Sequence, residues 1–152
     1  MKGEDNMNRL NLVCVGVKDM SRALAFYKAI GFQTPETSDD PPIVFFDNEG
    51  SKLELYPITE LLKDIDSENP PQMSEGTFSG ITFACNMMFK EDVDATMKLV
   101  EDAGGEVVKP PQTVFWGGYS GYFRDLDGHY WELAYSDNWK FDEQNMLIIE
   151  ND

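Results

Sequence analysis

Two segments of the sequence, about 75 residues apart, carry the same pattern and thereby limit the folds open to the chain. Gly50 is followed four positions later by Glu54 in GSKLEL, and Gly128 is followed four positions later by Glu132 in GHYWEL. Each segment is typical of a strand after a tight turn, with apolar residues on one face and the glutamate on the other. A long period in only two copies predicts a pseudo-twofold fold, because solenoids need three or more shorter repeats.

The first copy of the pattern is the last strand of a predicted β-α-β-β-β order of elements. The β-branched run at 10–17 indicates a buried strand. Apolar residues at helical spacing over 20–30, followed by Gly31, predict an amphipathic helix with a left-handed cap. Three short strands are expected after this helix, at 32–34, 43–47 and 52–56.

The second half repeats the succession. A strand is expected at 78–85 and a helix at 91–103, where Gly104-Gly105 ends the helical pattern. Three further strands are expected at 106–109, 119–125 and 129–135, with a loop over 110–118.

The predicted fold class is α+β, with two tandem βαβββ modules in one domain over residues 1–152. Module one covers about 9–57 and module two about 78–136, joined by a polar linker at 58–77 that carries one or two helical turns at 60–65. The extension at 137–152 contains the apolar run 146–149. We expect it to pack on its own domain or on a dimer partner.

Composition restricts the partners. The chain has 152 residues, 41% of them hydrophobic, which is enough to bury one core. Its 12 Lys+Arg against 28 Asp+Glu give a net charge of −16, which repels nucleic acid and anionic membranes. No apolar run reaches the roughly 18 residues of a membrane span, and residues 1–7 are polar without a signal-peptide pattern, so a cytoplasmic protein is expected. The two cysteines, Cys14 and Cys85, lie in apolar strand-like runs and are expected to be buried reduced thiols.

The order of elements, with KDMSRALAFYKAIGF after the first strand and GYFRDLDGHYWEL before the last, resembles the vicinal oxygen chelate superfamily. This superfamily includes glyoxalase I, bleomycin resistance proteins and extradiol dioxygenases. The resemblance covers nearly all of 10–136. It implies two modules side by side, each curling its sheet into half of an open barrel. It also implies a pocket for a small organic ligand between the modules, often completed by dimerisation, so we expect a homodimer.

The resemblance also implies where a metal ion would bind. In metal-using members four inward side chains hold one divalent ion, one on the first strand and one on the fourth strand of each module. Glu54 and Glu132 match the fourth-strand positions, whereas Leu12 and Gly80, at the first-strand positions, supply no donor. The only histidine, His129, points to the face opposite Glu132. Two carboxylates alone suit zinc, nickel or iron poorly, but they are compatible with a weakly bound Mg²⁺ or Mn²⁺.

Without a metal ion, the glutamates need another environment. They would be paired with a donor such as Tyr56, Tyr122 or Arg124, or protonated, or simply solvated. Arg124 could alternatively hold an anionic substrate or pair with Asp125 or Asp127 on the surface. The acidic turn at 125–128 resembles a metal loop, but hairpin turns favour these residue types for backbone reasons.

The loop at 115–121 interleaves three aromatic residues with three glycines. It predicts a flexible lid over an apolar pocket, or else a plug in which Trp116 closes the barrel or packs at a dimer contact. The residues expected to bind the ligand are Trp116, Tyr119, Tyr122, Arg124, Tyr56, Cys14 and Thr82.

Fold alone does not assign a reaction, so the sequence leaves open whether the chain is an enzyme. The first hypothesis is a small-molecule-binding protein that lacks the full metal-ligand set. The second is a metal-dependent lyase or isomerase of the glyoxalase I (lactoylglutathione lyase) type, or a dioxygenase, with Glu54 and Glu132 as catalytic residues. The third is a non-catalytic dimeric scaffold.

Overall fold

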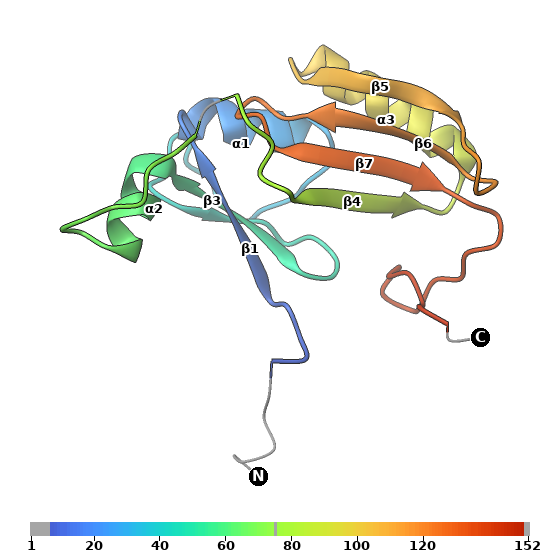
Figure 1. The fold of residues 1–152 in the computed structure, drawn as a ribbon, viewed down its shortest axis with the longest axis horizontal. Helices are drawn as coiled ribbons and strands as arrows, with labels where there is room; N and C mark the ends of the chain where they lie inside the picture. Colours follow the sequence, from blue (N-terminus) through green and yellow to red (C-terminus); the bar gives the residue numbers. More distant parts are fainter. Residues whose placement is uncertain (1–6, 75, 151–152) are drawn as a thin grey trace, which may run out of the picture.

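The computed structural model describes residues 7–74 and 76–150, which form an α+β fold of two separate sheets with helices (Figure 1). One sheet has three strands and the other four, and each comes from one of the two predicted modules. In the part of the chain that is described, no helix combines the length and apolar character needed to cross a membrane.

The first sheet has the strand order β1-β3-β2, with β1 at Leu12–Val17, β2 at Val44–Phe45 and β3 at Lys52–Pro57. Strands β1 and β3 run parallel because helix α1 (Met20–Ala29) crosses between the sheet's ends. Asp19 caps this helix by accepting a hydrogen bond from the Arg22 backbone N–H at 3.1 Å. Gly31, at φ 118°, follows its end and confirms the predicted left-handed cap.

The strand predicted at 32–34 is absent. This stretch runs beside β2, but only the Asp47 N–H joins it through the backbone, to the Gln33 carbonyl at 2.7 Å. The Thr34 hydroxyl donates to the Phe45 carbonyl at 2.7 Å and thereby takes the position of a backbone donor. Pro35 has no N–H, so the ladder does not continue. The first sheet therefore has one strand fewer than the second.

The segment expected as a linker contains a full helix, α2 at Ile58–Ile65, where one or two turns had been predicted. Its Ile58 and Leu61 side chains lie against Gly16 of β1, where a Cβ atom would collide with Ile58. The helix therefore covers one end of the first sheet, and glycine at position 16 makes this contact possible.

The second sheet has the order β4-β7-β6-β5. It consists of β4 at Thr82–Met87, β5 at Glu106–Thr113, β6 at Tyr119–Arg124 and β7 at Tyr130–Tyr135, with helix α3 at Lys90–Asp102. Strand β4 begins later than the predicted position 78. Strand β5 continues through Pro110-Pro111, where a loop was expected. The two prolines are tolerated within the strand because β5 lies at the edge of the sheet and its register shifts on both sides of Lys109.

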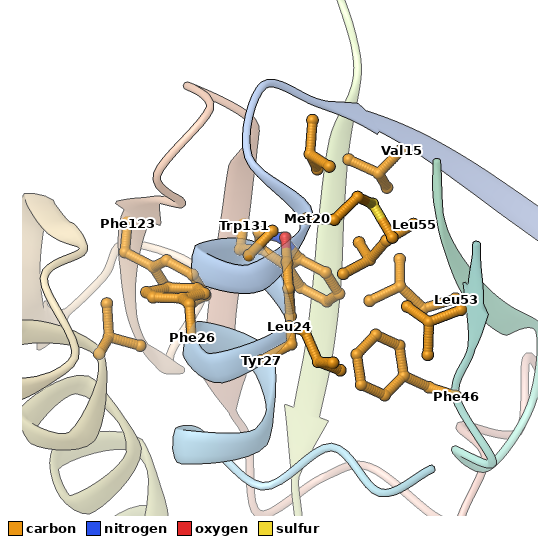
Figure 2. Packing of buried hydrophobic residues seen from close by; sticks show 14 of the residues in the cluster. Val15, Met20, Leu24, Phe26, Tyr27, Phe46, Leu53, Leu55, Phe123 and Trp131 are labelled. Atoms are coloured by element: carbon orange, nitrogen blue, oxygen red, sulfur yellow. The ribbon is translucent and has the colours of Figure 1, made fainter. Parts of the chain in front are cut away.

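The core lies between α1 and both sheets (Figure 2). On α1, Phe26 packs against Phe123 of β6 with ring centroids 6.4 Å apart, and Tyr27 packs against Trp131 of β7 at 6.1 Å. Leu55 of β3 is completely buried on the opposite side of this cluster. A single helix of the first module thus supplies apolar surface to both modules, and its burial is the main term that holds them together.

A buried polar network accompanies this contact. The Tyr27 hydroxyl donates to the Asp125 carboxylate at 2.5 Å and accepts from Trp131 Nε1 at 3.1 Å. The other carboxylate oxygen of Asp125 accepts the backbone N–H groups of Asp127 and His129. Because Asp125 begins the turn between β6 and β7, the network fixes this turn against α1.

The same turn also contacts the junction of β1 and α1. Asp127 Oδ1 accepts the Lys18 backbone N–H at 2.8 Å, and His129 Nε2 lies 3.0 Å from the Gly16 carbonyl oxygen. The acidic residues of this turn thus bind backbone groups, as the hairpin alternative predicted. They join the two modules, a role the sequence did not suggest.

The C-terminal extension folds back onto the first module. A β-bridge between Phe141 and Leu147 closes a small hairpin. Asn145 donates to the Glu49 carboxylate at 3.2 Å, and a Cβ atom on Gly50 would lie 2.6 Å from the Met146 methyl group. The extension therefore packs on its own chain through Asn145 and Met146, while residues 151–152 of the prediction lie outside the described ranges.

Replacing Tyr27 by phenylalanine should lower the free energy of unfolding by about 1–3 kcal/mol, because Asp125 and Trp131 then lose a buried hydrogen-bond partner. Urea denaturation of the wild type and Tyr27→Phe measures the difference. Tyr119→Phe is the matched control, since it removes a hydroxyl whose bond to Asp94 is exposed. Equal losses in the two variants would contradict a special role for the buried network.

The pKa of Asp127 is raised, first by desolvation and then by the nearby Asp125 carboxylate, against the lowering effect of the Lys18 N–H. The folded state therefore holds this proton to a higher pH than the unfolded state does. Its stabilising contribution is present at acidic pH and is lost as pH rises through the folded-state pKa.

Asp127→Asn keeps the acceptor for Lys18 but carries no charge. At pH 7 it should be at least as stable as the wild type, and its advantage should shrink as the pH falls through the acid range. Chemical denaturation at several pH values tests this expectation. Asp127→Ala lacks the acceptor for the Lys18 N–H, so its free energy of unfolding should be about 0.5–2 kcal/mol lower than that of the wild type. An Asn variant that is less stable than the wild type at pH 7 would contradict the expected direction of the effect.

Candidate functional site

Glu54 lies on the uncovered face of the first sheet. Its neighbours in the chain, Leu53 and Leu55, are 4% and 0% exposed and belong to the core, so alternation turns Glu54 to the other side. Directly opposite it are Cys14 of β1 and Phe45 of β2. The structure thus confirms the alternation that was predicted from the repeat. Glu54, Cys14 and Phe45 form the centre of a surface that we call the Glu54 face, and this surface also includes Leu12, Gly16, Lys52 and Tyr56.

The Cys14 thiol is the polar partner of Glu54. Its pKa is raised to about 11, first by desolvation and then by the charge of Glu54 and the hydrogen bond to it. The pKa of Cys85 is raised as well, by desolvation and by Glu49. Both cysteines are free, as predicted, but both are exposed and not buried. The reason is that Cys14 points to the uncovered side of its sheet and Cys85 lies on the edge strand β4.

Glu132 occupies the corresponding place on the second sheet. Trp131 and Leu133 are buried on the core side, and the residues opposite Glu132 are Ala84 of β4 and Tyr122 of β6. The pKa of Tyr122 is raised by desolvation and by the charge of Glu132 and the hydrogen bond to it. Each glutamate therefore has one neutral hydrogen-bond donor on a neighbouring strand, Cys14 in the first module and Tyr122 in the second.

The residues around the glutamates do not fit a four-ligand divalent ion of the kind the fold implies. Leu12 faces Lys52 across β1 and β3, and Gly80 precedes β4 with φ 84°. Ala84, opposite Glu132, also lacks a donor. Within residues 7–74 and 76–150, no group of three or more His, Cys, Asp and Glu side chains is placed to hold a metal ion. No chemical step can therefore be assigned to such an ion here.

A hollow of about 580 Å³ opens beside Phe45, the cross-strand neighbour of Glu54 on β2. Its lining combines apolar and polar side chains, namely Leu12, Gln33, Thr34, Pro35, Phe45, Phe46, Asp47 and Lys52. A smaller hollow of about 280 Å³ shares Thr34, Pro35 and Phe45 with it. Both sets of lining residues come from the first module alone. The Phe45 side chain, 46% exposed, lines both hollows.

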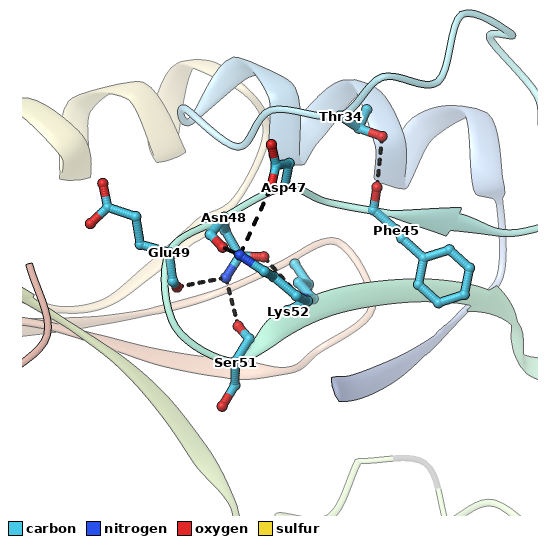
Figure 3. A network of polar contacts seen from close by, with 8 residues as sticks. Thr34, Phe45, Asp47, Asn48, Glu49, Ser51 and Lys52 are labelled. Atoms are coloured by element: carbon cyan, nitrogen blue, oxygen red, sulfur yellow. Dashed lines mark hydrogen bonds and ion pairs between the residues drawn. The ribbon is translucent and has the colours of Figure 1, made fainter. Parts of the chain in front are cut away.

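Lys52 lines the larger hollow, but its ammonium group is held by the β2–β3 hairpin (Figure 3). It donates to the Asn48 carbonyl oxygen and lies 3.8 Å from the Asp47 carboxylate. Asn48 in turn fixes the hairpin, since its side chain donates to the Ser51 carbonyl at 2.6 Å and accepts the Leu53 N–H at 2.9 Å. The one cation on this face thus interacts with the hairpin.

Trp116, expected in a flexible lid or a plug, is stacked on Trp139 of the C-terminal extension. The ring centroids are 5.6 Å apart and the planes differ by 22°. The Trp116 ring also covers Gly118, on the side of the second sheet that carries Glu132. Phe115 beside it is fully exposed. The loop is thus tied to the extension, a contact that the sequence analysis did not predict for Trp139.

The other predicted ligand-binding residues are distributed over both sides of the sheets. Tyr119 points to α3, where its hydroxyl donates to Asp94 at 2.7 Å, and is therefore on the side away from Glu132. Arg124 shares the Glu132 side but is bonded to Glu106. Thr82 is exposed on that side, and Tyr56 is half-buried on the Glu54 face.

Phe45 and Lys52 were not predicted as site residues. The signal for Phe45 was the alternation in IVFFD, which buries Val44 and Phe46 and leaves Phe45 on the face that carries Glu54. For Lys52 the corresponding signal was its position two residues before Glu54 in the same strand.

Comparison with known proteins gives a family match for most of the chain. Residues 9–133 match the model of the Glyoxalase/Bleomycin resistance protein/Dioxygenase superfamily. No curated protein sequence gives a match.

Several solved structures share the fold. A glyoxalase-related enzyme from Fulvimarina pelagi superposes with a TM-score of 0.81 at 22% identity, covering 95% of this chain and 100% of that chain. The hypothetical protein SA1046 from S. aureus gives 0.71 at 22% identity, with 89% and 98% covered. Lactoylglutathione lyase from Agrobacterium tumefaciens gives 0.64 at 22% identity, with 90% and 100% covered. At these identities the likeness concerns the fold alone.

With a pKa of about 11, only about 0.1% of Cys14 is thiolate at pH 8, so alkylation by iodoacetamide should be slow. Glu54→Gln removes one cause of the raised pKa and should speed the reaction several-fold, while desolvation keeps it slower than for a free thiol. Mass spectrometry of Cys14 in a Cys85→Ser background measures the rate. Glu49→Gln in the same background is the control, and equal rates in all three proteins would refute the influence of Glu54.

Proposed function

Because the chain belongs to the Glyoxalase/Bleomycin resistance protein/Dioxygenase superfamily, we propose that it binds a small organic molecule on the Glu54 face without a catalytic metal ion. The observation that carries this proposal is the hollow beside Phe45, whose lining combines apolar side chains with polar and charged ones. Such a combination is usual for small-molecule sites, where apolar contacts supply affinity and the polar groups set orientation. The missing ligand donors at Leu12 and Gly80 argue against metal-assisted chemistry at this place.

We propose that the site is completed in a homodimer. The Glu54 face exposes Leu12 and Phe45, which are 47% and 46% exposed, and the second module exposes Phe78 and Ile81 before β4. Apolar side chains gathered on uncovered faces favour association. A second subunit would cover these side chains and close the hollow from the open side.

The two alternative functions have less support. A lyase, isomerase or dioxygenase that uses Glu54 and Glu132 would need at least two more metal ligands, and Leu12 and Gly80, at the positions where the resemblance places them, supply no donor. The hollow itself argues against a pure scaffold, because a scaffold would fill its pocket with its own side chains.

Three measurements test the proposal. Protein purified without chelator should contain far less than one divalent ion per chain, and an aromatic amphipathic ligand library should give hits that raise the melting temperature equally with and without EDTA. Phe45→Ala should weaken these hits, whereas Leu99→Ala, which removes an exposed apolar side chain on α3, should not. Sedimentation equilibrium should give the mass of a dimer.

One result would overturn the proposal: a stoichiometric divalent ion whose removal abolishes an enzymatic turnover that Glu132→Gln also abolishes. A library without any hit in the wild type would overturn it as well.

A further inference from the structure

The chemical class of the ligand follows from the charges and walls of the Glu54 face. We propose that this face selects an amphipathic organic cation, with an ammonium or amidinium group at Glu54 and an apolar body in the hollow beside Phe45. This inference rests on the proposed function, since it names the kind of molecule that the same site takes.

The first step is the position of Glu54 relative to the hollow. Its cross-strand partner Phe45 lines the hollow. Lys52 and Leu12 line it too, and they lie two residues before Glu54 on β3 and two residues before Cys14 on β1. A group held at the Glu54 carboxylate is therefore at the rim of the hollow. An attached apolar body can reach Leu12, Pro35 and Phe45 directly.

The second step is the direction in which the ligand extends. Toward the other end of the strands, Ile58 and Leu61 of α2 cover Gly16, where even a Cβ atom has no space. This end of the Glu54 face is closed. An apolar group attached to a head at Glu54 thus finds its space in the other direction along the strands, toward Leu12 and the hollow of about 580 Å³.

The third step is the charge. Glu54 has the Cys14 thiol as a neutral partner, and no Lys, Arg or His pairs with it among the ion pairs of the described residues. The one cation on the Glu54 face, Lys52, is engaged with the Asn48 carbonyl and Asp47. A ligand head at Glu54 therefore meets an uncompensated carboxylate within a chain of net charge −16. A cation is attracted there and an anion is repelled.

Three molecules with the same phenethyl skeleton separate charge from apolar contact: phenethylamine, phenethyl alcohol and hydrocinnamate. Each molecule is titrated into the full chain at low salt, and binding is measured by NMR chemical shifts and by calorimetry. The amine should bind at least about threefold more tightly than the alcohol, and the acid should bind most weakly. The preference should diminish at high salt, because screening weakens a partly exposed charge pair.

Variants assign the effect to residues. Glu54→Gln should reduce the affinity for the amine to that for the alcohol and leave the alcohol unchanged. Glu68→Gln removes the same charge from an exposed loop and should preserve the preference. Phe45→Ala should weaken the amine and the alcohol alike, because it shortens the wall that both skeletons contact. Melting curves of each variant establish that it is folded.

The outcomes separate the inference from the function on which it rests. Equal affinities for amine and alcohol, or a preference for the acid, would overturn the cationic class while the small-molecule site stands. An amine preference that survives Glu54→Gln would overturn the placement of the cationic head at Glu54. Absence of binding by all three, together with a library without hits, would overturn both.

Discussion

The placement of α1 against both modules is the constraint on which the remaining structure depends. Its Phe26 and Tyr27 side chains contact Phe123 and Trp131 of the second sheet, while the same helix covers the first sheet from which it emerges. Aromatic packing supplies the burial, and the bonds among Tyr27, Asp125 and Trp131 fix the orientation. A polar group in such a place must be satisfied, so the network allows few alternative arrangements of the two modules.

The location of the site follows from this arrangement. Each sheet has one face covered by helices and core residues, and alternation along β3 and β7 sends Glu54 and Glu132 to the other face. Helix α2 covers the Gly16 end of the Glu54 face, and the β2–β3 hairpin with Lys52 and Asn48 bounds the opposite end. The hollow beside Phe45 is what remains between these boundaries, and apart from Phe46 its lining residues do not belong to the buried core.

The repeat and the hydrophobic periodicity were sufficient to predict both modules, α1, α3 and the outward direction of the two glutamates. These features depend on local spacing, which the sequence carries directly. The failed or missing predictions depend on tertiary contacts. The strand at 32–34 lost its ladder to the Thr34 side chain, β5 tolerates two prolines only as an edge strand, and α2 is stabilised by its position on Gly16. The hollow beside Phe45 and the contact of Trp116 with Trp139 join distant parts of the chain, which no local pattern reveals.

The long sequence separation within the central network has a consequence for synthesis of the protein. Tyr27 is 98 positions before Asp125 and 104 positions before Trp131, so its partners leave the ribosome long after Tyr27 does. Until then the aromatic side of α1 has no native surface to cover it, and closing so long a loop is slow. The nascent first module therefore presents an aromatic helix to chaperones and to neighbouring chains until these partners have been synthesised. The high negative charge opposes aggregation in this interval.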